Sequence, residues 1–477
     1  MASRRSLVVF VACVLILAAC TGTETAVDPM ASPDVFAPTP SIGDLSPPTT
    51  ARPAPTTTVD VETAVIYPVD PVTLDALPGF EPIPMGDWAW GVASPNGRWL
   101  ALLFGDDSGL NEGVRLVDVP EWRVVGEWPQ LTGSPMSVSD DGLVQAFGYA
   151  GPNPQLVRTG VESGVPETIA DLPSQFSPWG MPRLWNNLIV LTGQNYDPTS
   201  SQTTVTIVVV DQLTGMIAET GLPGAGMGAT ELVDLGDGRT GVIDSNPALV
   251  WDEGNGRILV VHATEDLVTE FDLGSSEVID HRFGPAIDDA PAQVTQDQMN
   301  DADLWSSTRR TAALGPGGEV IYAASVVGEF VERDGSMISI TEPSGLVAID
   351  TGTWEIVDRL DAPISDVFIS PDGNRLIATG YRDESTASNY VSESSGLYVI
   401  DPFGLEVMAH HPPDRVNRYY GAVSYSRDGS LAYVTSYTTV EEVCVVDLDS
   451  GAVLSCRSGI QVIGEVATVV DMTRSGG

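Results

Sequence analysis

Short apolar runs alternate along this chain with a recurring turn of serine, proline or a charged residue, aspartate or asparagine, and glycine. The clearest copies lie in Ser94–Ala101, Ser370–Ala378 and Ser426–Val434. Weaker copies lie in Ser139–Leu143, Asp252–Leu259 and Gly315–Tyr322. Proline presets φ, the Asx side chain hydrogen-bonds the local backbone, and glycine takes a positive φ. Each copy therefore predicts a tight turn between two strands.

A second element follows each of these turns: a β-branched run that ends in an aspartate and is followed by a turn containing glycine or proline. Its copies are Leu116–Asp118, Val209–Asp211, Phe271–Asp272, Ala348–Asp350, Val399–Asp401 and Val446–Asp447. Apolar runs bounded in this way are typical of strands joined by tight hairpins. We interpret this element as the hairpin between the third and fourth strands of a repeating unit.

Together the two elements define units of four short strands that begin near residues 88, 135, 179, 245, 308, 364 and 418. Four-stranded repeats of this length are typical of a β-propeller, in which stacking buries faces that one unit cannot bury alone. We expect an all-β propeller over residues 61–472 with seven blades, and inserts leave six or eight open. The segment 61–67 is the expected extra strand that closes the ring beside the final hairpin, and 291–303 is the one candidate helix.

The last repeat also resembles a known family. Leu431–Ser436, which follows Ser426–Gly429, is similar to the repeats of YVTN-type and WD40-like bacterial propellers. The resemblance covers most of residues 61–472 and implies the propeller fold. It says little about activity, because propellers serve as binding modules, scaffolds and enzymes.

The N-terminal residues predict an export signal. Arg4 and Arg5 precede the apolar run Leu7–Leu17, which spans only about half of a membrane's hydrocarbon core. Leu17–Cys20 resembles the lipobox of bacterial lipoproteins, which implies cleavage after residue 19 and lipidation of Cys20. We expect an exported protein anchored by lipid to the outer face of the cytoplasmic membrane or cell envelope. An ordinary secretory signal with a chance cysteine is the alternative.

Residues 20–60 form the expected link between anchor and propeller. This stretch is rich in proline and threonine and poor in large apolar residues. Such a composition cannot build a packed core and favours an extended, disordered tether.

The chain is strongly acidic, with a formal net charge of -43, and all its basic side chains apart from histidine are arginines. Such a surface repels nucleic acids and anionic lipid headgroups, so we exclude both as direct partners. We attribute the acidity to solubility or to adaptation of the whole proteome, and a specific cation-binding role is the alternative. A monomer is expected.

Two of the four cysteines, Cys444 and Cys456, flank a predicted hairpin turn near Ser450. A hairpin places them opposite each other on neighbouring strands, within disulfide distance. An exported protein favours a disulfide there. Two reduced core cysteines are the alternative.

No catalytic set is evident in the sequence. It lacks a nucleophile elbow and a phosphate-binding glycine loop, and His410 and His411, adjacent on a strand, point to opposite faces. No cofactor is expected. Ca²⁺ at Asp297, Asp301 and Asp303 is the weaker alternative to a solvated acidic loop, because their spacing fits no defined calcium loop.

Aromatic and arginine side chains lie at or just before several of the expected innermost strands. We predict that they gather at one end of the central channel and bind a sugar, a peptide or an anionic group. The predicted binding residues are Trp88, Trp90, Trp179, Trp305, Arg309, Arg418, Tyr419 and Tyr420. The alternative for each is that it fills a gap between blades.

These observations favour a non-catalytic binding or interaction module of the cell envelope. Two alternatives stay open: a propeller-type hydrolase or lactonase with an unidentified site, and a structural or assembly component of the envelope. The ligand is an unknown sugar, peptide or protein.

Overall fold

The computed structural model describes residues 64–469 except 87, 106–112, 130, 132, 149–152, 162–163, 180, 198–201, 286–293, 295, 334, 387–389, 414–418, 427, 438–441 and 464–465. The predicted signal peptide (1–19), Cys20 and the linker (20–60) lie outside the described residues, and so does Arg418.

Six hydrogen-bonded sheets contain the strands of the described residues. The first joins both ends of the chain: β1 (Ala64–Pro68), β2 (Ile83–Gly86), β3 (Trp88–Ala93), β4 (Trp99–Gly105), β5 (Gly113–Asp118), β6 (Arg123–Trp128), β34 (Ile460–Ile463) and β35 (Val466–Val469). The second holds β7 (Gly133–Val138), β8 (Leu143–Gly148), β9 (Gln155–Gly160) and β10 (Glu167–Asp171). The third holds β11 (Phe176–Pro178), β12 (Arg183–Trp185), β13 (Leu188–Asp197), β14 (Gln202–Asp211) and β15 (Ile217–Gly226).

The remaining three sheets are antiparallel apart from one parallel pair of strands in the ten-stranded sheet. One holds β18 (Ala248–Asp252), β19 (Arg257–Val261), β20 (Leu267–Asp272) and β21 (Val278–Arg282). The ten-stranded sheet holds β16 (Gly228–Gly236), β17 (Arg239–Asn246), β22 (Leu304–Leu314), β23 (Val320–Arg333), β24 (Ser336–Asp350), β25 (Glu355–Leu360), β26 (Asp366–Ile369), β27 (Leu376–Ser385), β28 (Tyr390–Asp401) and β29 (Glu406–His411). The last holds β30 (Tyr419–Tyr425), β31 (Leu431–Tyr437), β32 (Glu442–Asp447) and β33 (Val453–Ser458).

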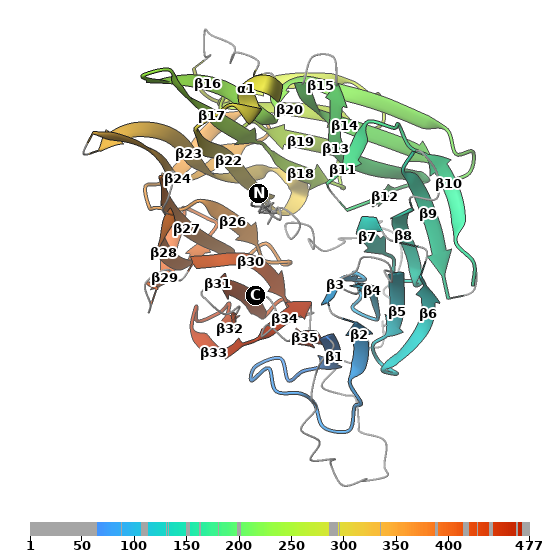
Figure 1. The fold of residues 1–477 in the computed structure, drawn as a ribbon. Helices are drawn as coiled ribbons and strands as arrows, with labels where there is room; N and C mark the ends of the chain where they lie inside the picture. The colour runs from blue at the N-terminus through green and yellow to red at the C-terminus, as the bar shows by residue number, and fades with distance from the viewer. Residues whose placement is uncertain are drawn as a thin grey trace, which may run out of the picture.

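The sheets stand around a common centre, so the protein is an all-β propeller (Figure 1). Each repeating unit is a four-stranded antiparallel meander, as in β26–β29 and β30–β33. Apolar side chains from successive meanders pack together, and β4, for example, carries seven consecutive buried residues. Burial of both faces explains why these strands read as continuous apolar runs.

The expectation of seven separate blades is wrong, because the strands do not pair into seven separate sheets. Five of the six sheets formed by the described residues contain one four-stranded meander each, and the ten-stranded sheet contains two. The two are joined because β24 continues beyond its meander and pairs with β27. The insert strands β16 and β17 extend the same sheet through a parallel pairing of β17 with β22.

One short α-helix occurs among the described residues, α1 (Gln296–Asn300), within the segment expected to be helical. A 3₁₀ turn at Pro316–Gly318 lies between β22 and β23. The described residues contain no helix long and apolar enough to cross a membrane.

The recurring serine turn has the predicted local chemistry. Ser370 Oγ donates to Asp372 Oδ1 (2.6 Å) and accepts from the Arg375 N–H (2.9 Å). The Ser426 hydroxyl does the same with Asp428 and Leu431. Hydrogen bonds within the motif therefore hold the turn without any contact from the next unit.

The turns also contact one another between units. A Cβ on Gly373 would lie 1.9 Å from Pro316 Cγ of the preceding unit, and Gly373 has φ of 72°. Gly429 has φ of 71° and faces Pro371, but its Cβ would lie at an ordinary 3.9 Å. The motif's glycine therefore serves both the turn and the interface between units.

The second recurring element is an aspartate-capped turn. Asp350 Oδ1 accepts the Thr353 N–H (2.7 Å), and this bond chiefly holds the Asp350 pKa below its ordinary value. Asp211 makes the matching contacts with Thr214. The aspartate that ends each β-branched run thus fixes the hairpin to the fourth strand.

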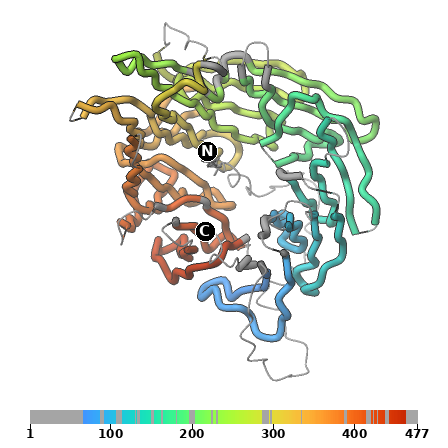
Figure 2. The backbone as a smooth tube through the Cα atoms, in the orientation of Figure 1, coloured from blue at the N-terminus to red at the C-terminus, as the bar shows by residue number. Residues whose placement is uncertain are grey.

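Both ends of the described chain meet to close the ring. β1 pairs with β35, so the segment expected to lie beside the final hairpin instead pairs with a short hairpin that follows it. Figure 2 shows the blue N-terminal and red C-terminal segments side by side. Val69 and Leu74 pack against buried residues of the last meander, including Tyr433.

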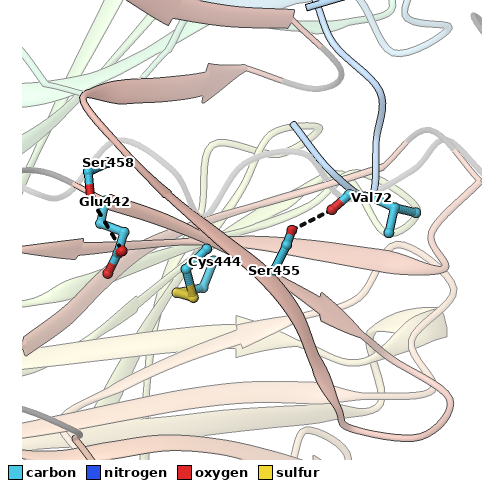
Figure 3. The surroundings of a disulfide bond; sticks show 6 residues. Val72, Glu442, Cys444, Ser455 and Ser458 are labelled. Carbon is cyan, nitrogen blue, oxygen red and sulfur yellow. Dashed lines mark hydrogen bonds between the residues drawn. A yellow bond between two sulfur atoms is a disulfide. The ribbon is translucent and has the colours of Figure 1, made fainter. Parts of the chain in front are cut away.

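The predicted disulfide is confirmed between Cys444 and Cys456, which are directly opposed on β32 and β33 (Figure 3). The neighbours of Cys456 hold the N-terminal segment: Ser455 Oγ donates to the Val72 carbonyl, and Arg457 Nη1 donates to the Leu74 carbonyl (2.7 Å). The disulfide therefore fixes β33, the strand that hydrogen-bonds the N-terminal segment where the ring closes.

Candidate functional site

The strands that carry most of the predicted binding residues lie around the centre of the ring. β3, β22, β26 and β30 are the first strands of their meanders and line the centre in Figure 1. β22 contacts β26, and β30 contacts the meander that contains β26. The structure thus brings together the strands of Trp88, Trp90, Trp305, Arg309, Tyr419 and Tyr420.

The side chains divide into three groups. Trp88, Trp90 and Tyr419 lie in described strands, but their side chains are outside the described set. Tyr420 is buried and packs with Val423 and Val434. Trp305, at the start of β22, is 47% exposed and is available for a ligand.

Trp179 directly follows β11, the first strand of its sheet, and its N–H donates to the Thr192 carbonyl of β13 (3.1 Å). Its side chain is half-buried against the core that contains Val190 and Leu222, and its Nε1 finds no hydrogen-bond partner among the described residues. This position favours a packing role over direct contact with a ligand in the channel.

Arg309 is held inside an interface between two meanders. Its Nη2 lies 2.9 Å from Asp366 of β26 and donates to the Tyr381 hydroxyl of β27 (2.9 Å). Only 14% of the Arg309 side chain and 9% of the Asp366 side chain are exposed. Burial alone would lower the pKa of Arg309, but Asp366 and Tyr381 more than offset it and raise that pKa. Arg309 is therefore a fixed, neutralised cation.

More polar groups surround this pair. The Ser365 hydroxyl donates to Asp366 Oδ2 (2.8 Å), and burial raises the pKa of Tyr381 to about 12. Asp383, further along β27, has its pKa raised by burial, and its Oδ1 finds no partner in the described part of the chain. The sequence did not single out Asp366, Tyr381 or Asp383, because no local motif marks them.

Arg310 points to the other side of β22. It lies 3.6 Å from Asp266 and over the Phe283 ring, in the interface with the preceding meander. Burial lowers its pKa, and its Nε has no partner within the described residues. Arg309 and Arg310 therefore do not form one cationic group.

The histidines make separate polar contacts. His262 is buried, and its Nε2 lies 2.8 Å from Thr269 Oγ1, which donates to Asp280 (2.7 Å). Because Thr269 gives its proton to Asp280, His262 Nε2 donates, and burial lowers the His262 pKa. His410 contacts the Ser395 carbonyl, whereas His411 contacts the Gly451 carbonyl of the next meander.

The acidic insert does not form a metal-ligand group in the described residues. Asp303 Oδ2 accepts the Thr240 N–H (2.9 Å), Asp301 is exposed, and the Asp297 side chain is outside the described set. The one candidate metal-ligand group among all the described residues is Glu442 with Cys444 and Cys456, whose sulfurs are bonded to each other.

No family model matches this chain. No curated protein matches it either. Among solved structures, it is similar to the dihydro-heme d1 dehydrogenase NirN in complex with DHE, at 15% identity and TM-score 0.46 over 91% of this chain and 82% of that one. An oligogalacturonate lyase from Vibrio parahaemolyticus has 11% identity and TM-score 0.41 over 87% and 96%, and TolB from Acinetobacter baumannii has 12% and 0.33 over 78% and 77%. We infer no activity from these similarities.

Proposed function

We propose that the protein is a non-catalytic binding or interaction module of the cell envelope, which receives its ligand at the end of the ring where the innermost strands begin. The observation that carries this proposal is the convergence of β3, β22 and β30 around the centre. Meanders that follow one another in the same sense start their first strands at the same end of a propeller. The exposed Trp305 lies at the start of β22, in the part of that strand that pairs with β17 before the pairing with β23 begins.

The chemistry of this end suits a neutral or amphipathic ligand. Arg309 is already neutralised by Asp366, which leaves aromatic stacking as the main attraction offered by the described side chains. A sugar face or an aromatic peptide side chain fits that requirement better than a free anion does.

A screen of the purified protein for ligands that raise its melting temperature tests the proposal. We expect a sugar or peptide that stabilises the protein to lose this effect in Trp305→Ala. The effect should persist in Phe403→Ala, a control that removes a 79% exposed aromatic ring from the turn between β28 and β29. Equal losses in both variants contradict the proposal, and metal-dependent hydrolysis of a screened compound favours the hydrolase alternative.

We also propose that the module is tethered through lipid on Cys20 and the proline-rich segment 20–60. The lipobox-like Leu17–Cys20 and the basic residues before the apolar run support this location. Several acyl chains at about 0.8 kcal/mol per buried methylene anchor a protein firmly. We expect Cys20→Ser to move the protein from the membrane fraction to the soluble fraction, and a protein that stays with the membranes contradicts the lipid anchor.

A further inference from the structure

Two long hairpins form a surface beside the ring. β23–β24 and β27–β28 both continue beyond the parts that pair within their meanders. They join where Ser339, Ile340 and Thr341 pair with Ser385, Glu384 and Asp383. We call the described parts of 327–342 and 381–394 the hairpin platform, and Figure 1 shows its strands on the left of the ring.

Ion pairs hold the two hairpins together. Arg333 Nη1 lies 2.6 Å from Glu384, and Arg382 Nε lies 2.9 Å from Glu342. The bond to Glu342 is the main cause that raises the Arg382 pKa. Both arginines of the platform are thus occupied within it, and the platform is a preformed unit.

The platform carries uncompensated negative charge. Glu329, Glu332 and Glu393 are exposed and make no ion pair among the described residues. With both arginines already paired, these carboxylates give the platform a net negative potential. A cationic partner is attracted, and an anionic one is repelled.

No strand among the described residues pairs with one edge of the platform. Residues 390–394 of β28 pair with β27 on one side, whereas the pairing of β28 with β29 starts only at Leu397. Alternate backbone groups along 390–394 therefore lack a ladder partner within the described sheet. Tyr390 is 62% exposed and Val391 is 38% exposed along this edge.

An open edge can be guarded by charge against pairing with other chains. Glu393 has this effect against a second copy of this protein, because pairing of two such edges brings like charges together. The same carboxylate attracts a strand that carries lysine or arginine. Tyr390 adds an aromatic face on which a cation can rest.

We propose that the hairpin platform binds an extended, lysine- or arginine-rich peptide segment of another protein by strand addition to residues 390–394. Backbone hydrogen bonds along the open edge supply affinity, and Glu393 and Tyr390 select cationic side chains. Tyr381, at the base of the platform, contacts Arg309, but residues 390–394 include none of the predicted binding residues. The inference therefore does not depend on the function proposed above.

Fluorescence anisotropy with a labelled peptide of alternating lysine and valine tests this inference on the full chain at about 0.15 M salt. We expect the peptide to bind, and the matching glutamate–valine peptide not to bind. A lysine–valine peptide methylated on alternate backbone nitrogens should bind roughly tenfold more weakly, because it keeps the charge but cannot form the ladder.

Two protein variants separate the edge from the general acidity of the surface. Glu393→Lys should weaken binding by roughly tenfold, and Glu393→Gln by less. Glu406→Lys makes the same charge change at an exposed residue of β29 and should leave binding unchanged. Failure of the lysine–valine peptide to bind overturns the inference. So does equal binding of the methylated peptide, or equal weakening by Glu393→Lys and Glu406→Lys.

Discussion

Replacing Gly373 with alanine should destabilise the protein by about 2–5 kcal/mol. The left-handed backbone at Gly373, with φ of 72°, costs a non-glycine residue about 1–2 kcal/mol. The new Cβ would also lie 1.9 Å from Pro316 Cγ, so the turns of two successive units must move apart. Overpacking of this kind costs about 1–3 kcal/mol.

Gly429→Ala is the matched control for that measurement. Gly429 has nearly the same φ, 71°, in the same motif, but its Cβ would lie 3.9 Å from Pro371. We expect Gly429→Ala to cost only the backbone term of about 1–2 kcal/mol. Urea unfolding of both variants gives the comparison. Equal losses mean that contact between the turns contributes nothing.

The repeating units could be predicted from the sequence because their signals are local. A serine turn closed by the motif's own hydroxyl, and an aspartate that caps two N–H groups, depend on residues only a few positions apart. Such turns fold in the same way wherever the chain places them. The predicted starts near 308, 364 and 418 accordingly lie close to the first residues of β22, β26 and β30.

The pairing of units into one sheet could not be predicted in this way. β24 pairs with β27 because both hairpins continue past their meanders, and no turn residue fixes where a hairpin crosses to its neighbour. The sequence also did not show that the residue four positions after the aspartate of these turns adopts a left-handed backbone when it is not glycine. Trp122 and Trp354 occupy this position with positive φ, and Trp354 stacks on His281 of another unit.

The candidate site was predictable only as far as strand position allows. Innermost strands carry most of the predicted binding residues, but the partners of a side chain depend on packing between units. Asp366 and Tyr381, which bind Arg309, lie on the next meander. A sequence pattern therefore identified Arg309 as a candidate ligand for anions, and the structure shows it paired.

Removing the carboxylate that neutralises Arg309 should be among the most damaging single changes in the propeller. Asp366→Ala removes the counterion of a guanidinium that is only 14% exposed in the wild-type protein, and leaves the Tyr381 hydroxyl as its hydrogen-bond partner among the described residues. Breaking a buried ion pair in this way costs about 3–5 kcal/mol, because the remaining charge is desolvated without compensation. Chemical unfolding of Asp366→Ala against the wild-type protein measures the loss.

The double variant Arg309→Met/Asp366→Leu distinguishes loss of the pair from loss of packing. It removes both charges together, and we expect it to recover most of the stability lost by Asp366→Ala. Glu121→Ala breaks the exposed pair with Arg123 and should cost less than about 1 kcal/mol. If the double variant is as unstable as Asp366→Ala, the cost arises from the cavity, and Arg309 does not need a buried counterion.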